Sequence, residues 1–308
     1  METTRQHGQA LSLTRWLPGD TNSYLLGTIS GHNVVMVCLP AGGIGTNSNV
    51  QYGLMVGIGG GVPSSQSDIR LGDVVVSKPV DSHPGVVQYD FGKTMSGGRF
   101  VQTGTLNRPP DILLGSVSSL QAQYSTMASP LSGLPGWKRD QLFEASYVHL
   151  EFEDDCSDCD ITRLVTTAPR PTEEPQVWYG LIASGNQVIK DGFTRDHVAK
   201  QSPVLCFEME AAGIMNYLPC LVIRSICDYC DFHKKKKWQG YAAMTAAAYA
   251  KLLLSIVPKA PAPMQQPEGE TGGRSSKTKL MLLPAGLTAS PEEIECRQHL
   301  FITDPGKI

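Results

Sequence analysis

The stretch Val204-Leu-Cys-Phe-Glu-Met-Glu-Ala-Ala-Gly-Ile-Met-Asn-Tyr-Leu-Pro-Cys-Leu-Val-Ile-Arg-Ser-Ile-Cys-Asp228 decides the fold. It opens with the apolar run Val204–Glu208, continues as a helical segment at Glu210–Tyr217 that Pro219 closes, and ends with the apolar run Leu221–Cys227. Short apolar runs of this kind are typical of strands that a sheet buries on both faces. Strand, helix and strand in this order predict part of an α/β sheet.

The same alternation extends over the rest of the chain. Helical spacing at Asp111–Gln123 and an Ala-rich segment at Tyr241–Val257 predict two further helices. Further short apolar runs are predicted strands: Val34–Leu39, Leu54–Ile58, Val74–Val76 and Trp178–Ser184. In a mainly parallel sheet, ligands bind outside the carboxyl ends of the strands. We therefore expect the chemistry at the polar residues that follow Ile58, Phe207 and Ile226.

The composition bounds the class of protein and its partners. The chain has 308 residues, of which 41% are apolar and 18% charged, with a net charge of -3. These values are ordinary for a globular protein and give no reason to expect a nucleic acid or an anionic membrane as partner. The first ten residues have no apolar core of a signal peptide, and no run reaches the ~18 apolar residues of a membrane span. We expect a cytoplasmic protein.

Changes in composition predict the domain boundaries. Residues 1–21 are poorly patterned, and 22–257 form the predicted domain. Within it, 125–176 is rich in Pro, Ser, Asp and Glu and is predicted to be an irregular excursion from the core. Residues 258–308 are predicted to be an unstructured C-terminal tail.

The eight cysteines are interpreted as free thiols, because most stand singly in apolar runs. Cys156 and Cys159, and Cys227 and Cys230, have the C-x-x-C spacing of zinc ligands. The two pairs lie much farther apart than the roughly 15–20 residues typical of zinc modules. We expect neither a metal nor a cofactor.

Asp228 is the first candidate for catalysis, because it directly follows a buried apolar strand. Partial desolvation favours the protonated form of such a carboxyl group. A protonated carboxyl can donate a proton to N7 of a purine and so improve the leaving group. The alternative is a strand-end Asp that caps the next turn.

Two carboxylates flank a methionine at Glu208-Met209-Glu210. A carboxylate here can hold both hydroxyls of a ribose and stabilise the oxocarbenium-like state of glycosidic cleavage. If these residues continue the strand, both Glu side chains face one way. If a helix begins here, only one faces the site, and the acids can equally be placed by the helix dipole.

Two other stretches are weaker signals. Gly57-Ile-Gly-Gly-Gly61 allows close approach of the backbone to a ligand, but matches neither the dinucleotide nor the P-loop pattern. The basic run Lys234–Lys237 is predicted to be a solvated loop, with attraction of a phosphorylated ligand as the alternative.

Taken together, these motifs resemble the purine nucleoside phosphorylase superfamily. The motifs, in chain order, are Leu54–Pro63 (LMVGIGGGVP), Ile69–Ser77 (IRLGDVVVS), Tyr179–Asp191 (YGLIASGNQVIKD), Phe207–Gly213 (FEMEAAG) and Ile223–Asp228 (IRSICD). The pattern is most similar to the fungal nucleoside phosphorylase domain found at the front of NACHT, ankyrin or tetratricopeptide proteins. It is more remotely similar to methylthioadenosine/S-adenosylhomocysteine nucleosidase. The resemblance covers about residues 22–257 and implies a three-layer α/β sandwich with a mixed, mainly parallel twisted sheet.

The resemblance also implies the ligand and the site. The ligand is a purine nucleoside, and members of the family commonly form homo-oligomers. Asp228 corresponds to the acid that protonates the purine, and Glu210 to the carboxylate that binds the ribose hydroxyls. The substrate-binding positions are Met209 beneath the sugar, Phe207, Val188, Ile189, Asn186, Trp238, Gly57 and Gly59.

The chain departs from the family pattern in ways that bear on the reaction. The family's opening strand ends in an acid that activates water, and Met1–Asp20 has no such strand. A whole helix of the family is missing between Gly45 and Leu54. Met55 and Ile58 stand where the phosphorylases hold phosphate, which favours hydrolysis over phosphorolysis. Two alternatives stay open: a true phosphorylase that uses phosphate, and a non-catalytic nucleoside-binding or signalling module, which the absent acid favours.

Overall fold

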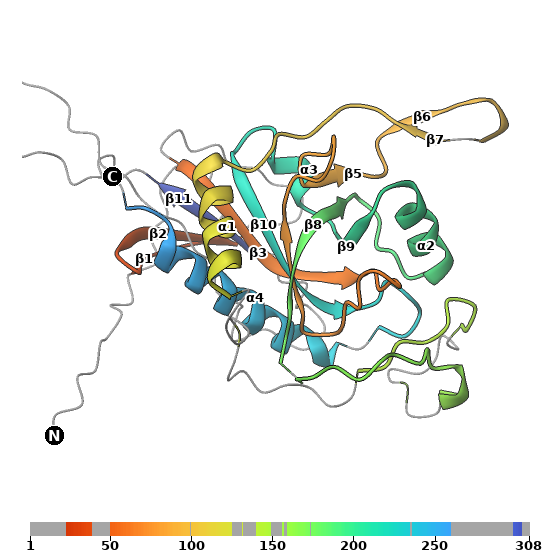
Figure 1. The fold of residues 1–308 in the computed structure, drawn as a ribbon. Coiled ribbons are helices and arrows are strands. Elements are labelled where there is room, and N and C mark those ends of the chain that lie inside the picture. Colours follow the sequence, from red (N-terminus) through yellow and green to blue (C-terminus); the bar gives the residue numbers. More distant parts are fainter. Residues whose placement is uncertain are drawn as a thin grey trace, which may run out of the picture.

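The computed structural model describes residues 23–38, 50–98, 100–124, 131, 140–148, 156, 159–172, 174–234, 236–259 and 298–303. One large mixed sheet with helices on both faces makes up this part of the chain (Figure 1). The helices are α1 (Asp111–Tyr124), α2 (Gly192–Gln201), α3 (Ala211–Ile214) and α4 (Lys237–Ile256). The strands are β1 (Ser23–Ile29), β2 (His32–Cys38), β3 (Val50–Gly61), β4 (Val74–Ser77), β5 (Val86–Gln88), β6 (Gly92–Thr94), β7 (Phe100–Gln102), β8 (Val177–Ser184), β9 (Val204–Glu208), β10 (Cys220–Asp228) and β11 (Gln298–Thr303).

The large sheet has the strand order β1-β2-β11-β3-β10-β4-β8-β5, and β9 pairs with both β3 and β8. β10 is parallel to β3, and β8 is parallel to β4, β5 and β9. The pairings of β10 with β4, of β3 with β9, and among β1, β2, β11 and β3 are antiparallel. The parallel pairs bring the carboxyl ends of β3 and β10 to one place, and those of β8 and β9 to another beside it.

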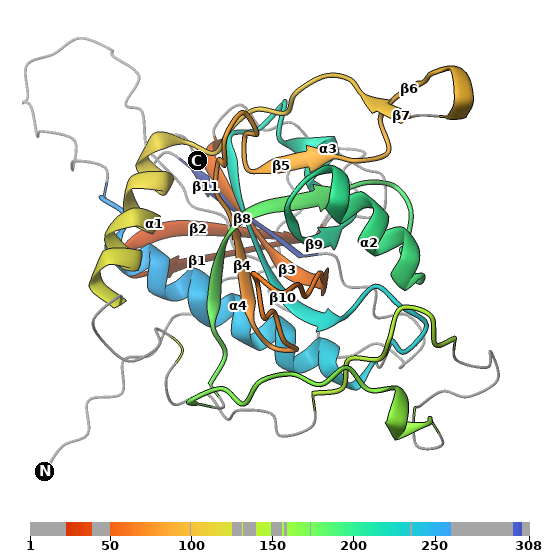
Figure 2. The same cartoon turned by 45° about the vertical axis from the view of Figure 1, so that its right-hand side comes forward.

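Alternation along the strands divides the core into two layers of side chains. On one face, Leu54 of β3 and Ile223 of β10 pack with Leu253 of α4 and with α1. On the other face, Met55 and Val222 pack with α3. The two views show α1 and α4 together on one side of the sheet and α3 on the other (Figures 1 and 2). This is the expected three-layer α/β sandwich.

Most of the elements predicted from sequence are present, with ends shifted by a few residues. Five strands, β1, β5, β6, β7 and β11, and the helix α2 were not predicted. Of these strands, β1 lies at the start of the predicted domain, and β11 lies inside the predicted unstructured tail. The prediction for 258–308 is therefore wrong at Gln298–Thr303, whose apolar sequence pairs with β2 and β3. Residues 1–21, and the tail at 260–297 and 304–308, lie outside the described residues.

The excursion at 125–176 is irregular where the structure describes it, apart from a 3-10 turn at Ile161–Arg163. Ion pairs attach one end of it to the core. Arg170 contacts Asp68 and forms a 2.7 Å ion pair with the buried carboxylate of Asp73, which also accepts a hydrogen bond from Trp178. In the parts of the chain that can be described, no helix is long and apolar enough to cross a membrane.

Candidate functional site

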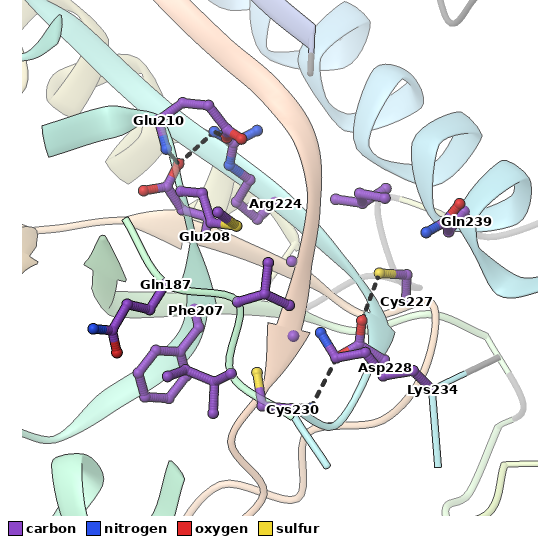
Figure 3. Close-up of a pocket in the computed structure, with 16 residues that line it drawn as sticks. Gln187, Phe207, Glu208, Glu210, Arg224, Cys227, Asp228, Cys230, Lys234 and Gln239 are labelled. Atoms are coloured by element: carbon purple, nitrogen blue, oxygen red, sulfur yellow. Dashed lines mark hydrogen bonds and ion pairs between the residues drawn. The ribbon is translucent and has the colours of Figure 1, made fainter. Parts of the chain in front are cut away.

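A cavity of about 140 Å³ opens at the carboxyl ends of β3, β9 and β10 (Figure 3). This is the place at which the sequence predicts the chemistry. Of the predicted site residues, seven line it: Gly59, Val188, Ile189, Phe207, Met209, Glu210 and Asp228. The resemblance and the geometry thus agree on one location for both proposed catalytic carboxyl groups.

A buried ion cluster forms one side of the cavity. Nη2 of Arg224 lies 2.5 Å from Glu208 Oε2 and 2.8 Å from Glu210 Oε2. The side chains of Arg224 and Glu208 are almost inaccessible, whereas that of Glu210 is 16% exposed. Burial opposes the charge on Arg224, but the two carboxylates leave its pKa raised. The arginine is therefore a fixed positive charge that holds Glu210 at the cavity wall.

Backbone geometry decides which of the two glutamates reaches the ligand space. Glu208 ends β9, and its carboxylate accepts hydrogen bonds from the backbone N–H groups of Glu210 and Ala211 at 3.1 Å. Glu210 precedes α3 and has left the strand conformation. The two side chains therefore do not alternate as in a strand. Glu208 fixes the turn, and Glu210 is the more accessible of the pair.

Asp228 stands at a bulge. The register between β10 and β3 shifts between Ile226 and Asp228, and bulges of this kind re-aim a side chain next to a site. Asp228 Oδ1 accepts the backbone N–H of Cys230 at 2.8 Å and lies 3.4 Å from Nζ of Lys234. Asp228 Oδ2 accepts the S–H of Cys227 at 3.3 Å. A thiol is a weak donor, so Oδ2 is the oxygen best able to interact with a ligand.

The cysteines around Asp228 are thiols, not thiolates. Burial, followed by the charge of Asp228, raises the pKa of Cys227 and Cys230 well above its ordinary value. Cys156 and Cys159 are also buried, and neither forms a disulfide. Within the described residues, no group of three or more His, Cys, Asp and Glu side chains gathers to hold a metal.

The glycine turn of β3 is shaped by close contacts. A Cβ added at Gly60 would lie 2.1 Å from Cys230 Sγ and 2.8 Å from Asp228 Oδ1. A Cβ at Gly59 would lie 2.8 Å from the carbonyl oxygen of Phe207. The glycines thus let β9 and the Asp228 loop approach β3.

The remaining wall is apolar and is held by Tyr89, the residue that follows β5. Phe207 packs edge-on against Tyr89, with ring centroids 5.3 Å apart. The Tyr89 hydroxyl donates to the carbonyl of Gln187 at 3.0 Å, and this orders the segment that carries Val188 and Ile189. The cavity thus combines a flat apolar wall with carboxyl groups on two of its sides, as Figure 3 shows for Phe207, Glu210 and Asp228.

Three predicted substrate-binding residues do not line the cavity. Trp238 is 2% exposed and packs with Cys227 and Ala242, whereas its neighbour Gln239 in α4 lines the cavity. Asn186 is exposed, and its backbone N–H donates to Asp90 at 2.7 Å. Gly57 lies inside the sheet, where it is the partner of Arg224 in the pairing of β3 with β10, and it does not reach the cavity.

The sequence analysis missed two cations at the site, Arg224 and Lys234. An arginine in a buried strand must be paired, so Arg224 could have been recognised as the partner of nearby acids. Lys234 was grouped with a solvated basic run, but its side chain is 28% exposed and contacts Asp228. Although burial lowers it, the neighbouring Asp228 carboxylate leaves the pKa of Lys234 raised.

No protein-family model matches the sequence. A relative from Hyaloscypha variabilis, described as "Nucleotide-binding leucine-rich repeat (NLR)-like protein", is 40% identical over 319 residues. The match covers 94% of this chain and 32% of the relative. The chain thus spans about a third of the length of the curated relative it matches.

The structure is similar to several solved nucleosidases. The methylthioadenosine/S-adenosylhomocysteine nucleosidase of Streptococcus pneumoniae with 8-aminoadenine has a TM-score of 0.49 at 18% identity, with 82% of this chain and 91% of that chain covered. For the Neisseria meningitidis nucleosidase the TM-score is 0.47 at 16% identity, with coverage of 81% and 90%. For the futalosine hydrolase of Helicobacter pylori it is 0.46 at 16% identity, with coverage of 78% and 86%.

At these values the solved structures assign no role to any residue of this chain. The chain's own mixed sheet, with helices on both faces and the quoted motifs at its strand ends, is an α/β fold of three layers.

Proposed function

We propose that this chain cleaves the N-glycosidic bond of a purine nucleoside, by hydrolysis rather than phosphorolysis. The observation that carries the proposal is the placement of Glu210 and Asp228 in one cavity with an apolar wall. The wall suits a purine ring, and the two carboxyl groups suit the two ends of the bond that breaks.

Glu210 acts on the sugar. Its carboxylate accepts hydrogen bonds from the ribose 2′ and 3′ hydroxyls and stabilises the positive charge that develops on the ring. Arg224 restrains this carboxylate through the 2.8 Å ion pair. Met209, which lines the cavity beside Glu210, supplies apolar contact under the sugar.

Asp228 acts on the base. In its protonated form it donates to N7, and the base leaves as a neutral molecule. General acid catalysis of this kind contributes about 10²- to 10⁴-fold in rate. The backbone N–H of Cys230 and the ammonium of Lys234 hold Oδ1, so that Oδ2 is the oxygen directed to the base.

The charges of the cavity favour water over phosphate as the nucleophile. Three carboxyl groups line it, those of Glu208, Glu210 and Asp228, against two cations, Arg224 and Lys234. Both cations are already paired with these carboxylates. With Asp228 protonated, the carboxylates of Glu208 and Glu210 balance the two cations, so a phosphate dianion would meet no excess of positive charge among the described cavity residues. A transition state with positive charge on the sugar is stabilised by the Glu210 carboxylate.

A second candidate is a nucleoside-binding module without turnover. It is favoured by the match to part of an NLR-like protein, and by the position of β1 and β2 at the edge of the sheet, from which neither contributes a residue to the cavity. In the described part of the chain, these two strands therefore place no acid in the cavity that could activate water.

One assay separates the candidates. Purified protein is incubated with adenosine, inosine, guanosine and methylthioadenosine, with and without phosphate, and the products are identified by chromatography. Free ribose or methylthioribose without phosphate supports hydrolysis. Ribose 1-phosphate formed only with phosphate supports a phosphorylase, and saturable binding without product supports the module.

A further inference from the structure

The loop that follows Asp228 is fixed from two directions at Tyr229. The side chain is 3% exposed, and its hydroxyl donates to Asp140 Oδ1 at 2.6 Å. The backbone carbonyl of the same residue accepts from Nη1 of Arg195 in α2 at 2.9 Å. The residue next to the proposed acid is thus held by the excursion on one side and by a helix on the other.

The excursion makes a second contact with the same loop. The ring of His233 stacks on Phe143, with centroids 4.2 Å apart, and on Tyr147, at 5.1 Å. Phe143 is itself paired by a bridge with Leu164, and an ion pair between Glu144 and Arg163 reinforces this hairpin-like arrangement. The described part of the excursion is therefore a folded support and not a loose loop.

The excursion also reaches a small cavity at Asp228. This cavity is lined by Asp228, Gln141, Tyr229 and His233, among others. Asp228 thus lines both the ligand cavity and a second space to which the excursion contributes Gln141.

We propose that Asp140 and Tyr229 are positioning residues whose hydrogen bond orients Asp228 for proton transfer to the leaving base. The inference rests on the proposed function. A general acid must lie within hydrogen-bond reach of the atom it protonates, and a displacement of about 1 Å can cost about 100-fold in rate. Loss of the hydroxyl frees the side chain of Tyr229, the residue that follows Asp228. The rate of proton transfer should therefore fall more than the affinity for the substrate.

A purely structural role for the pair predicts something different. It would lower stability, and it would lower the turnover of every substrate alike. The two roles are separated by comparing a substrate that needs an acid with one that does not. Inosine needs protonation of its base. The leaving group of 4-nitrophenyl β-D-ribofuranoside departs as a stable phenolate without a proton.

The experiment measures kcat and KM for both substrates in the unchanged chain, Y229F, D140A, D140N and a control, Y249F. Tyr249 is also buried but lies in the interior of α4 and does not line the cavity. Asn at position 140 keeps an oxygen that accepts the Tyr229 hydroxyl, so D140N tests conservative rescue. The ratio of the two turnover rates within one variant does not depend on how much of that variant is folded.

We expect Y229F and D140A to lose about tenfold in kcat on inosine, with KM and turnover of the nitrophenyl riboside within about twofold of the unchanged chain. D140N and Y249F keep the unchanged ratio. Equal losses on both substrates, or no loss on inosine, would overturn the positioning role while leaving the proposed function intact. Turnover of neither substrate by the unchanged chain would overturn the proposed function and this inference together.

Discussion

Nη2 of Arg224, in the middle of β10, lies 2.8 Å from Oε2 of Glu210, the carboxylate that faces the cavity. The same nitrogen lies 2.5 Å from the fully buried Glu208. The arginine therefore links the stability of the sheet to the geometry of the site, and this link can be tested from both ends.

Arg224→Met should destabilise the fold strongly. It leaves the Glu208 carboxylate buried without its cation, and removal of one partner of a buried pair costs about 3–5 kcal/mol. The matched control is Arg163→Met, which breaks the half-exposed pair with Glu144 and should cost at most about 1 kcal/mol. Urea unfolding of both variants measures the difference. Similar small losses in the two variants would show that the buried cluster contributes no more to the free energy of unfolding than the half-exposed pair does.

Glu210→Gln should impair the sugar contact more than the fold. The amide keeps the shape of the side chain but loses the charge, so kcat/KM should fall by about 10- to 100-fold, as for a lost hydrogen bond to a charged group. The effect specific to the sugar contact is the ratio of kcat/KM for a ribonucleoside to that for its 2′-deoxyribonucleoside, which should be smaller in the variant. An unchanged preference would place the 2′ hydroxyl elsewhere in the cavity.

Gly60→Ala should displace the acid. The added Cβ would lie 2.1 Å from Cys230 Sγ and 2.8 Å from Asp228 Oδ1, so the loop must move. A shift of about 1 Å predicts a fall in turnover of about 100-fold. Gly115→Ala is the control, because its Cβ meets nothing within 4 Å on the exposed side of α1 and should add about 0.5–1 kcal/mol of stability. Normal turnover by the Gly60 variant would show that the close approach does not position Asp228.

Asp140→Asn should change how stability depends on pH. Burial raises the pKa of Asp140 above its ordinary value, so its contribution to stability is fully present below the unfolded pKa and is lost as the pH rises through the raised, folded pKa. The asparagine does not titrate. Its stability relative to the unchanged chain should therefore increase between pH 4 and pH 7 in urea unfolding. A constant or decreasing difference would contradict the burial effect on Asp140.

The sequence predicted the core of the fold because the decisive signals are local. The apolar runs that became β4, β8, β9 and β10, and the patterns of α1 and α4, follow from burial and periodicity within each segment. β11 could not be predicted in this way. Its place between β2 and β3 depends on pairing with strands more than 230 residues away, and no local pattern records such a pairing.

The site could be predicted in part for the same reason. Glu210 and Asp228 stand just beyond predicted strands, and in α/β sheets ligands bind outside the carboxyl ends of the strands. Trp238 does not line the cavity, because its distance from Asp228 in sequence does not reveal which side chain at the start of α4 packs into the core and which, as Gln239 does, lines the cavity. Lys234 was missed because a run of lysines resembles a solvated loop, and only the fold shows which of them reaches a buried carboxylate.

The most direct test of the account is the single-turnover rate of inosine cleavage by the unchanged chain and by Asp228→Asn, without phosphate. Asparagine accepts the same backbone N–H but cannot donate a carboxyl proton. The account predicts release of free ribose by the unchanged chain and a rate about 10²- to 10⁴-fold lower in the variant, with inosine still bound. Equal rates in the two proteins would contradict the assignment of Asp228 as the acid and, with it, the proposed mechanism.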